Sequence, residues 1–307
     1  MIRYILRRML QFIPVILLST FIVYALVFAI PGDPIRALSG DRPMPEAVQQ
    51  ALRDQYNLDD NLFVQYFKYM AGVLTGDFGT TFQGRPVSEI VAQRLPVTLY
   101  LAMVALIFQT VLGFIAGTLA ALYRDRFIDR LVQVSSVAVV AIPVLAIAFG
   151  LQLIFGLQLG WFPIAGAGAG FRSYILPGFT LAAVSTALVA RLLRNSLVET
   201  LGSDYVRTAT AKGLPRGRVV GRHAMRNALI PVVTFIGADL ATMIGGAIIT
   251  ESVFNLPGIG QQVFQSIQQQ EGTVVVGIVT ILVIFFVVVN LIVDIVYAYL
   301  DPRIRYE

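Results

Sequence analysis

Long stretches with few or no charged residues are the feature that most restricts what this chain can fold into. A transmembrane helix needs about 20 consecutive, mostly apolar residues, and charges are rare inside a bilayer because their burial there is costly. Six intervals of the sequence come close to this requirement. They lie at residues 9–30, 95–123, within 131–171, 173–190, 227–252 and 272–300. The sequence therefore predicts an all-α integral membrane protein with six transmembrane helices.

The composition supports a membrane protein over the other classes. Of the 307 residues, 57% are hydrophobic and 13% are charged, whereas soluble domains are about 25% charged. The apolar content argues against disorder. Without cysteine the chain has no disulfide or thiolate metal site, and one histidine argues against a histidine metal centre. The net charge of +5 comes without basic stripes interleaved with aromatics, so we expect no nucleic-acid partner.

The basic residues predict the orientation of the chain. Lys and Arg are enriched in the cytoplasmic segments of membrane proteins, and 16 of the 23 fall on one side of the six predicted spans. That side includes both ends of the chain, which we therefore expect in the cytoplasm. The first apolar run could belong to a signal peptide, but it is too long for one and lacks a small-x-small cleavage site, so we interpret it as a retained anchor.

The predicted outer side carries a long segment, residues 31–95. It contains eight acidic and six basic residues, and a polar helix is predicted at residues 46–56. We expect a small folded cap on the outer face. Its aromatic residues could form a docking surface for a partner, although packing within the cap or contact with lipid headgroups explains such residues more often. They are Tyr56, Phe63, Tyr66, Phe67 and Tyr69.

Residues 191–226 form the longest predicted cytoplasmic segment. The segment is basic and keeps a helical pattern that breaks at Gly213-Leu214-Pro215, which predicts a short helix, a turn and a second helix. Ala209, Ala211 and Gly213 leave room for the close approach of a partner. The alternative is an ordinary surface loop in which small residues occur by chance.

Two stretches of this segment resemble a known family. Residues 204–215 read DYVRTATAKGLP and residues 222–231 read RHAMRNALIP. They are similar to the coupling-loop signature of membrane subunits of ABC importers, in the dipeptide and oligopeptide permease branch. The first of the two membrane subunits, the dipeptide permease B type, is the most similar. Further matches are PGDP at 31–34, GDFG at 76–79, NLPGIGQ at 255–261 and DPRIRY at 301–306.

The resemblance implies the type I ABC importer permease fold and a set of partners. These are a homologous second permease subunit, two ATPase subunits or domains and an extracytoplasmic substrate-binding protein. It also implies a multi-pass protein of the bacterial cytoplasmic (inner) membrane, in contact with the lipid bilayer, that imports dipeptides or short oligopeptides. Glutathione, nickel chelates and haem are alternative cargoes within the same branch.

The chain itself is not expected to be an enzyme. Neither of its lysines, Lys68 and Lys212, lies in a Gly-x-x-x-x-Gly-Lys-Ser/Thr sequence, so the phosphate-binding loop of an ATPase is absent. ATP and Mg²⁺ are therefore expected on the partner ATPase subunits, with no cofactor or metal on this chain. The resemblance implies that residues 191–226, the coupling segment, face the ATPase subunits, and that the short helix around residues 207–213 docks in a cleft of one of them. The residues expected to make this contact are Arg207, Thr208, Ala209, Ala211, Lys212, Gly213 and Pro215.

These inferences divide the chain into three parts. Residues 1–30 are expected to form the N-terminal tail and first transmembrane helix, and residues 31–95 the extracytoplasmic cap. Residues 96–307 are expected to form a five-helix permease core, with the cytoplasmic coupling loop at about residues 191–229.

Asp239 is the candidate residue of the translocation pathway. It lies near the middle of the fifth predicted span, where a carboxylate costs about 2.5–3.5 kcal/mol on insertion scales. It could attract the amino end of a peptide, or it could pair with another helix, and the sequence does not favour either role. Glu251 ends the same span, and we expect it to bond the loop that follows.

Four further residues suggest contacts between helices. Asn290 and Asp294 lie four apart on the last span, which predicts an interhelical hydrogen bond. Gly113 and Gly117 form a G-x-x-x-G pair that is typical of close helix packing but also common by chance. Pro143 is expected to kink the third span.

Two other classes of protein are less well supported. Asp239 and Asp294 could be the pair of an intramembrane aspartyl protease, but they are expected at different depths and lack a Tyr-Asp pattern. A stand-alone carrier would be expected to show an inverted repeat, and the two halves of the sequence show no convincing one. ATPase subunits in the purified complex would separate an importer from both.

Overall fold

The computed structural model of the chain describes residues 2–28, 50 and 60–300, and the structural statements below concern these residues. Helices dominate them, and an isolated antiparallel bridge joins Thr80 and Pro86. Five helices are long and apolar enough to cross a membrane, or six if one bent pair counts as a span. The predicted all-α membrane architecture is confirmed.

The chain forms two compact units. Unit 1 comprises Met1–Val97 and Pro257–Glu307, and unit 2 comprises Thr98–Leu256. This division differs from the three consecutive parts expected from the sequence, because the last long helix packs in the same unit as the first.

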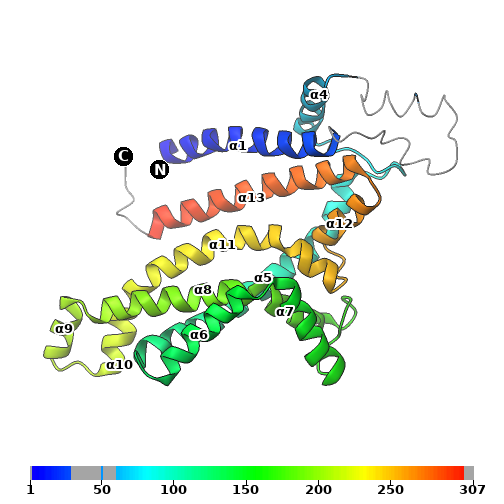
Figure 1. Cartoon of the computed structure of the whole chain (residues 1–307). Helices are drawn as coiled ribbons and strands as arrows, with labels where there is room; N and C mark the ends of the chain where they lie inside the picture. The colour runs from blue at the N-terminus through cyan, green and yellow to red at the C-terminus, as the bar shows by residue number, and fades with distance from the viewer. Residues whose placement is uncertain (1, 29–49, 51–59, 301–307) are drawn as a thin grey trace. The chain divides into compact units, whose positions relative to one another are not determined.

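Unit 1 is built around two long helices that lie side by side, α1 and α13 (Figure 1). Its helices are α1 (Ile2–Phe28), α4 (Leu62–Leu74), the first part of α5 (Val87–Leu122), α12 (Ile259–Gln268) and α13 (Gly272–Leu300). Asn61 is the N-cap of α4, and its side chain accepts the Phe63 backbone N–H (3.0 Å), a common N-cap arrangement. One apolar cluster joins α1, α4 and α13 through Tyr24, Tyr66 and Val276.

Glycines allow the turn at residues 76–79 to lie directly on α13. Gly79 has a φ of +89°, and a Cβ at this position would lie 2.6 Å from Cγ2 of Thr273. A Cβ at Gly277 would lie 2.3 Å from the backbone oxygen of Phe78. Since side chains do not fit at such distances, the GDFG sequence serves close packing within unit 1.

Unit 2 is organised around α8, which packs against α6, α7 and α11 (Figure 1). Its main helices are the rest of α5, α6 (Phe127–Ala141), α7 (Val144–Leu151), α8 (Ile175–Leu201), α9 (Asp204–Ala211), α10 (Arg216–Arg218) and α11 (Met225–Val253). Short π-helical segments follow α7 (Gln152–Gln158) and precede α11 (Val219–Ala224), and a 3₁₀ segment (Gly170–Tyr174) leads into α8.

Pro143 interrupts the third predicted span more strongly than expected. The segments Phe127–Ala141 and Val144–Gln158 are bent by 104°. Ile142 and Pro143 both have extended ψ angles, of 127° and 137°. A residue before proline avoids the helical conformation, so the predicted kink is confirmed but becomes a sharp break.

The G-x-x-x-G pair of α5 is a true helix contact. A Cβ at Gly113 would lie 2.6 Å from Cγ1 of Val189, and one at Gly117 would lie 2.7 Å from the backbone oxygen of Ala190. The two glycines therefore let α5 approach α8 closely, as small residues commonly do between membrane helices.

The start of the coupling segment differs from the prediction, and three predicted features cannot be compared with the structure. Helix α8 extends to Leu201, so Arg191 and Arg194 belong to a helix and the coupling segment begins later than expected. The predicted polar helix at 46–56 lies outside the described residues apart from residue 50, as do the PGDP and DPRIRY motifs.

Candidate functional site

The coupling segment has the predicted helix–break–helix form. Helix α9 ends at Ala211, and Gly213 follows with a φ of +75°, the left-handed conformation that glycine adopts readily. The N–H groups of Gly213 and Leu214 bond to the carbonyls of Thr210 and Ala209 (3.0 and 3.4 Å). The second helix is not separate, because α10 and its π-helical turn lead directly into α11.

Helix α9 turns one side inward. Val206 and Ala209 are only 4% and 6% exposed, and they pack in a cluster that includes Val219, Ala224 and Met225. The small side chain of Ala209 therefore serves packing within this chain. The other predicted contact residues are exposed to solvent. They are Arg207, Thr208, Ala211, Lys212, Gly213 and Pro215.

The exposed surface of the coupling segment is strongly basic. Nη1 of Arg207 lies 3.6 Å from Oδ1 of Asp204, and both side chains are highly exposed. Such an ion pair adds little stability. Asn227 donates to the hydroxyl of Tyr205 (2.8 Å) and ties α9 to α11. The exposed basic residues are Arg207, Lys212, Arg216, Arg218, Arg222 and Arg226. The segment thus presents a positive surface next to the first turns of the long helix α11.

A buried ion pair that the sequence analysis did not identify joins α6 to α8. Asp129, 1% exposed, accepts two hydrogen bonds from Arg194, from Nε (3.0 Å) and Nη2 (2.7 Å). Asp129 also accepts the backbone N–H of Asp125 and the amide of Gln133 (2.9 and 2.8 Å). The signal in the sequence is weak, because Asp129 is one of two acids in the basic stretch from Arg124 to Arg130 and its partner lies 65 residues away.

Asp239 lies in α11 and is half-buried. Its Oδ1 accepts a hydrogen bond from the hydroxyl of Thr242 (2.9 Å) in the same helix. Its Oδ2 is buried and has no partner among the described residues. A carboxylate with one unsatisfied oxygen can accept a further donor, which is compatible with both roles considered above.

Gln109 of α5 also has buried polar atoms without a hydrogen-bond partner among the described residues, and it was not predicted from the sequence. The side chain is fully buried, and neither of its amide atoms has a hydrogen-bond partner within the described residues. Ala105, one turn earlier, packs with Ala182 of α8 and Met243 of α11, and Asp239 lies one turn from Met243. Gln109 and Asp239 therefore flank the same small cluster in unit 2.

Of the two residues expected to form a hydrogen bond between helices, Asp294 makes an interhelical contact. Asp294 forms an ion pair with Arg8 (3.1 Å), which joins α13 to α1. The expectation for Asn290 is wrong, since its amide donates to the backbone oxygen of Phe286 in its own helix (2.9 Å). The side chain of Asn290 bonds this carbonyl because it lies one turn earlier in the same helix, within reach of a short polar side chain.

Glu251 holds the end of α11 in two ways. Its side chain is fully buried and accepts a hydrogen bond from the hydroxyl of Thr98 (2.6 Å). Its backbone oxygen accepts the N–H of Leu256 in the following turn (2.9 Å), so the main chain of Glu251 makes the expected bond to the loop.

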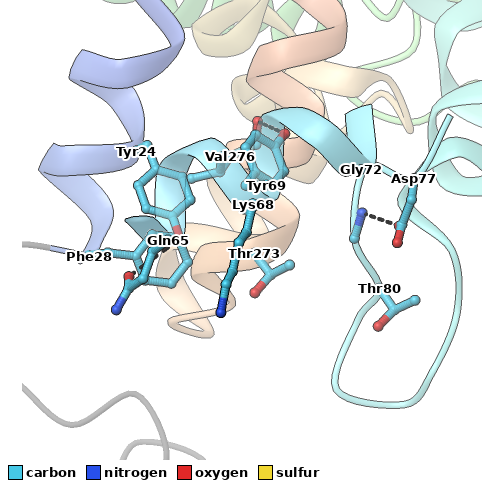
Figure 2. Close-up of a pocket in the computed structure, with 11 residues that line it drawn as sticks. Tyr24, Phe28, Gln65, Lys68, Tyr69, Gly72, Asp77, Thr80, Thr273 and Val276 are labelled. Carbon is cyan, nitrogen blue, oxygen red and sulfur yellow. Dashed lines mark hydrogen bonds between the residues drawn. The ribbon is translucent and has the colours of Figure 1, made fainter. Parts of the chain in front are cut away.

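Unit 1 contains a pocket of about 250 Å³ between α1, α4, the turn at 76–80 and the start of α13 (Figure 2). Lys68 forms an ion pair with Asp60, and Asp77 accepts the N–H of Gly79 (2.9 Å). The side chains from α4 that line the pocket, Gln65, Lys68 and Tyr69, lie on one side of that helix. The polar face of α4 therefore lines the pocket.

Comparison with known proteins covers the whole chain. Family models match residues 109–306, as "Binding-protein-dependent transport system inner membrane component", and residues 1–102, as the N-terminal part of such components. The glutathione transport system permease protein GsiC of Salmonella paratyphi A is 40% identical over 311 residues, and that of Escherichia coli K12 is 37% identical. Both alignments cover 100% of each chain.

Solved structures share the fold. An inward-facing structure of the MetNI methionine ABC transporter aligns with a TM-score of 0.59 at 19% identity, over 70% of this chain and 97% of that one. An amino acid ABC transporter solved with histidines aligns with a TM-score of 0.55 at 16% identity, over 69% and 94% of the two chains. The chain therefore belongs to the family of binding-protein-dependent transport system inner membrane components and is a membrane permease subunit of an ABC importer.

Proposed function

We propose that this chain and a homologous second subunit form the pathway for uptake of short peptides across the bacterial cytoplasmic membrane, with glutathione as the first cargo to test. The observation that carries this proposal is the 40% identity, over the full length of both chains, with a glutathione permease. Glutathione is itself a tripeptide, so the peptide-permease resemblance of residues 204–215 and 222–231 agrees with it.

In this proposal two ATPase subunits bind ATP and Mg²⁺ below the membrane, and an external binding protein delivers the cargo. The absence of a phosphate-binding loop in this chain supports the first part. The exposed positive surface of the coupling segment offers the contact with the ATPase subunits. The excess of Lys and Arg on the same side of the spans supports cytoplasmic termini.

Transport by the reconstituted complex tests the cargo. The permease subunits, ATPases and binding protein are placed in proteoliposomes, and ATP-dependent uptake of radiolabelled glutathione is measured with and without an excess of unlabelled dipeptide. We expect saturable uptake that fails when the ATPase subunits lack their phosphate-binding lysine. Uptake of nickel chelates or haem but not of either peptide would contradict the proposal and leave the importer assignment intact.

Replacing Gly213 by Val is expected to reduce coupling. Its φ of +75° is unfavourable for a β-branched residue by about 1–2 kcal/mol, although a Cβ there meets open space. The variant should assemble, but substrate-stimulated ATPase activity should fall severalfold because the turn that presents α9 must change. Gly217→Val is the matched control, since that glycine has open space and no positive φ. Equal ATPase stimulation in both variants would refute the prediction.

Replacing Asp239 by Asn is expected to lower uptake about tenfold or more. If the free carboxylate oxygen receives the amino end of the cargo, its loss removes a hydrogen bond to a charged group, worth about 1.5–3 kcal/mol. The measurement is the KM for uptake at equal amounts of assembled complex. An unchanged KM would show that Asp239 instead serves contacts between helices.

A further inference from the structure

The exposed face of α4 is apolar along the whole helix. Its exposed apolar residues fall within an arc of about 100° when placed on a helix of 3.6 residues per turn, and the exposed fractions of Phe67 and Leu74 reach 67% and 86%. Lys68 flanks this face at its edge. The members of the α4 apolar face are Phe63, Val64, Phe67, Ala71 and Leu74.

The opposite side of α4 is turned into unit 1. Tyr66 is buried against Tyr24 of α1, and Gln65 and Tyr69 line the pocket (Figure 2). The aromatic residues of α4 thus divide into two groups, with Phe63 and Phe67 facing outward and Tyr66 and Tyr69 facing the unit. The apolar face of such an amphipathic helix contacts an apolar environment, and its other face contacts the rest of the protein.

Contacts with α1 show how deep α4 lies. The Tyr66 hydroxyl donates to the backbone oxygen of Leu17 (2.8 Å) and lies 2.9 Å from Oγ1 of Thr20. The apolar span of α1 runs from Arg7 to Phe28, so at 1.5 Å per residue Leu17 lies about 16 Å below its end. A bilayer has a hydrocarbon core of about 30 Å. Helix α4 therefore contacts α1 well inside the part that crosses the membrane.

Contacts with α13 give the same result independently. The hydroxyl of Tyr69 donates to Oγ1 of Thr280 (2.9 Å). Thr280 lies eight residues into a span that begins at Gly272, which corresponds to about 12 Å along the helix. Two neighbouring spans thus place α4 beside their apolar segments and not above them.

We propose that α4 is embedded in the outer leaflet of the membrane and that its apolar face rests on lipid acyl chains. Phe63 stacks on Phe21 of α1 (5.3 Å between ring centroids), next to the exposed Ile22, so the apolar face continues the lipid-facing surface of a transmembrane helix. The bilayer is therefore the partner of this surface, in place of an external protein.

The ends of α4 suit this position. Backbone groups must be satisfied internally where lipid replaces water. The Asn61 side chain bonds the first turn, and the N–H groups of Thr75, Gly76 and Asp77 bond to carbonyls of Gly72 and Val73. Lys68, at the edge of the face, has its ammonium group paired with Asp60. Part of the region expected to form a small folded cap on the outer face thus belongs to the membrane.

Spin labelling tests this proposal cleanly because the chain has no native cysteine. Phe67→Cys and Leu74→Cys are labelled with a nitroxide in the full-length chain, reconstituted with its subunits in liposomes. Collision rates are measured with oxygen, which concentrates in lipid, and with a water-soluble nickel complex. Leu18→Cys on the exposed side of α1 is the lipid control, and Gln83→Cys in the exposed turn is the water control.

We expect the ratio of oxygen to nickel collisions at residues 67 and 74 to match that at residue 18 and to exceed that at residue 83 severalfold. Ratios equal to that at residue 83 would overturn the proposal, and so would protection that appears only after the external binding protein is added. A second measurement avoids the label. The single tryptophan is removed by Trp161→Phe and Phe67→Trp is introduced, and brominated lipids should then quench its fluorescence.

Discussion

Replacing Asp129 by Ala is expected to destabilise unit 2 by about 3–5 kcal/mol, because the mostly buried Arg194 guanidinium loses its counter-charge. Four hydrogen bonds to the carboxylate disappear together. The measurement is the thermal midpoint of the purified complex in mild detergent, followed by size-exclusion fluorescence. Arg124→Ala is the control, since its ion pair with Asp125 is exposed and such pairs contribute at most about 1 kcal/mol.

A double replacement separates loss of charge from loss of packing. Asp129→Leu with Arg194→Met removes both charges, and apolar replacements of a buried ion pair are often neutral. We therefore expect the double variant to recover much of the stability that Asp129→Ala loses. A single variant as stable as Arg124→Ala would show that the pair contributes little.

Replacing Gly117 by Leu is expected to force α5 away from α8. A Cβ there would lie 2.7 Å from the backbone oxygen of Ala190 and 2.9 Å from Cβ of Leu193, and backbone atoms cannot rotate away. Overpacking of this kind costs about 1–3 kcal/mol, so we expect a lower thermal midpoint and less assembled complex.

Gly150→Ala is the control for this prediction. Gly150 lies in α7, and a Cβ there meets no atom within 4 Å. Alanine is the better helix former by about 0.8–1.0 kcal/mol, so this variant should be as stable as the native chain or slightly more so. The close contact between α5 and α8 would be refuted if Gly117→Leu behaved like Gly150→Ala.

These two contacts make α8 the helix that connects the coupling segment to the rest of unit 2. Arg194 links it to α6 through Asp129, and Gly117 lets it lie against α5. Helix α9 follows α8 directly and is tied to α11 by the bond between Asn227 and Tyr205. A displacement of the coupling segment would therefore reach several spans as a movement of packed helices.

The sequence by itself determined the membrane class, five of the six predicted spans and the helical break at Gly213. Each follows from a local property. Hydropathy over about 20 residues identifies a span whatever its neighbours are, and Gly213 and Pro215 restrict their own backbone angles. The resemblance in the coupling segment and the close contact at Gly113 and Gly117 were also visible, since both depend on short spacings.

Only the tertiary structure decided which side chains meet. It placed Ala209 inside the unit, paired Asp294 with Arg8 and Asp129 with Arg194, and set α4 beside the apolar parts of α1 and α13. A membrane helix is apolar on its lipid side as well as on its packed side, so periodicity does not reveal which face contacts a neighbour. The pairing of residues far apart in the chain depends on how neighbouring helices are shifted and rotated, and that is a property of the packed fold.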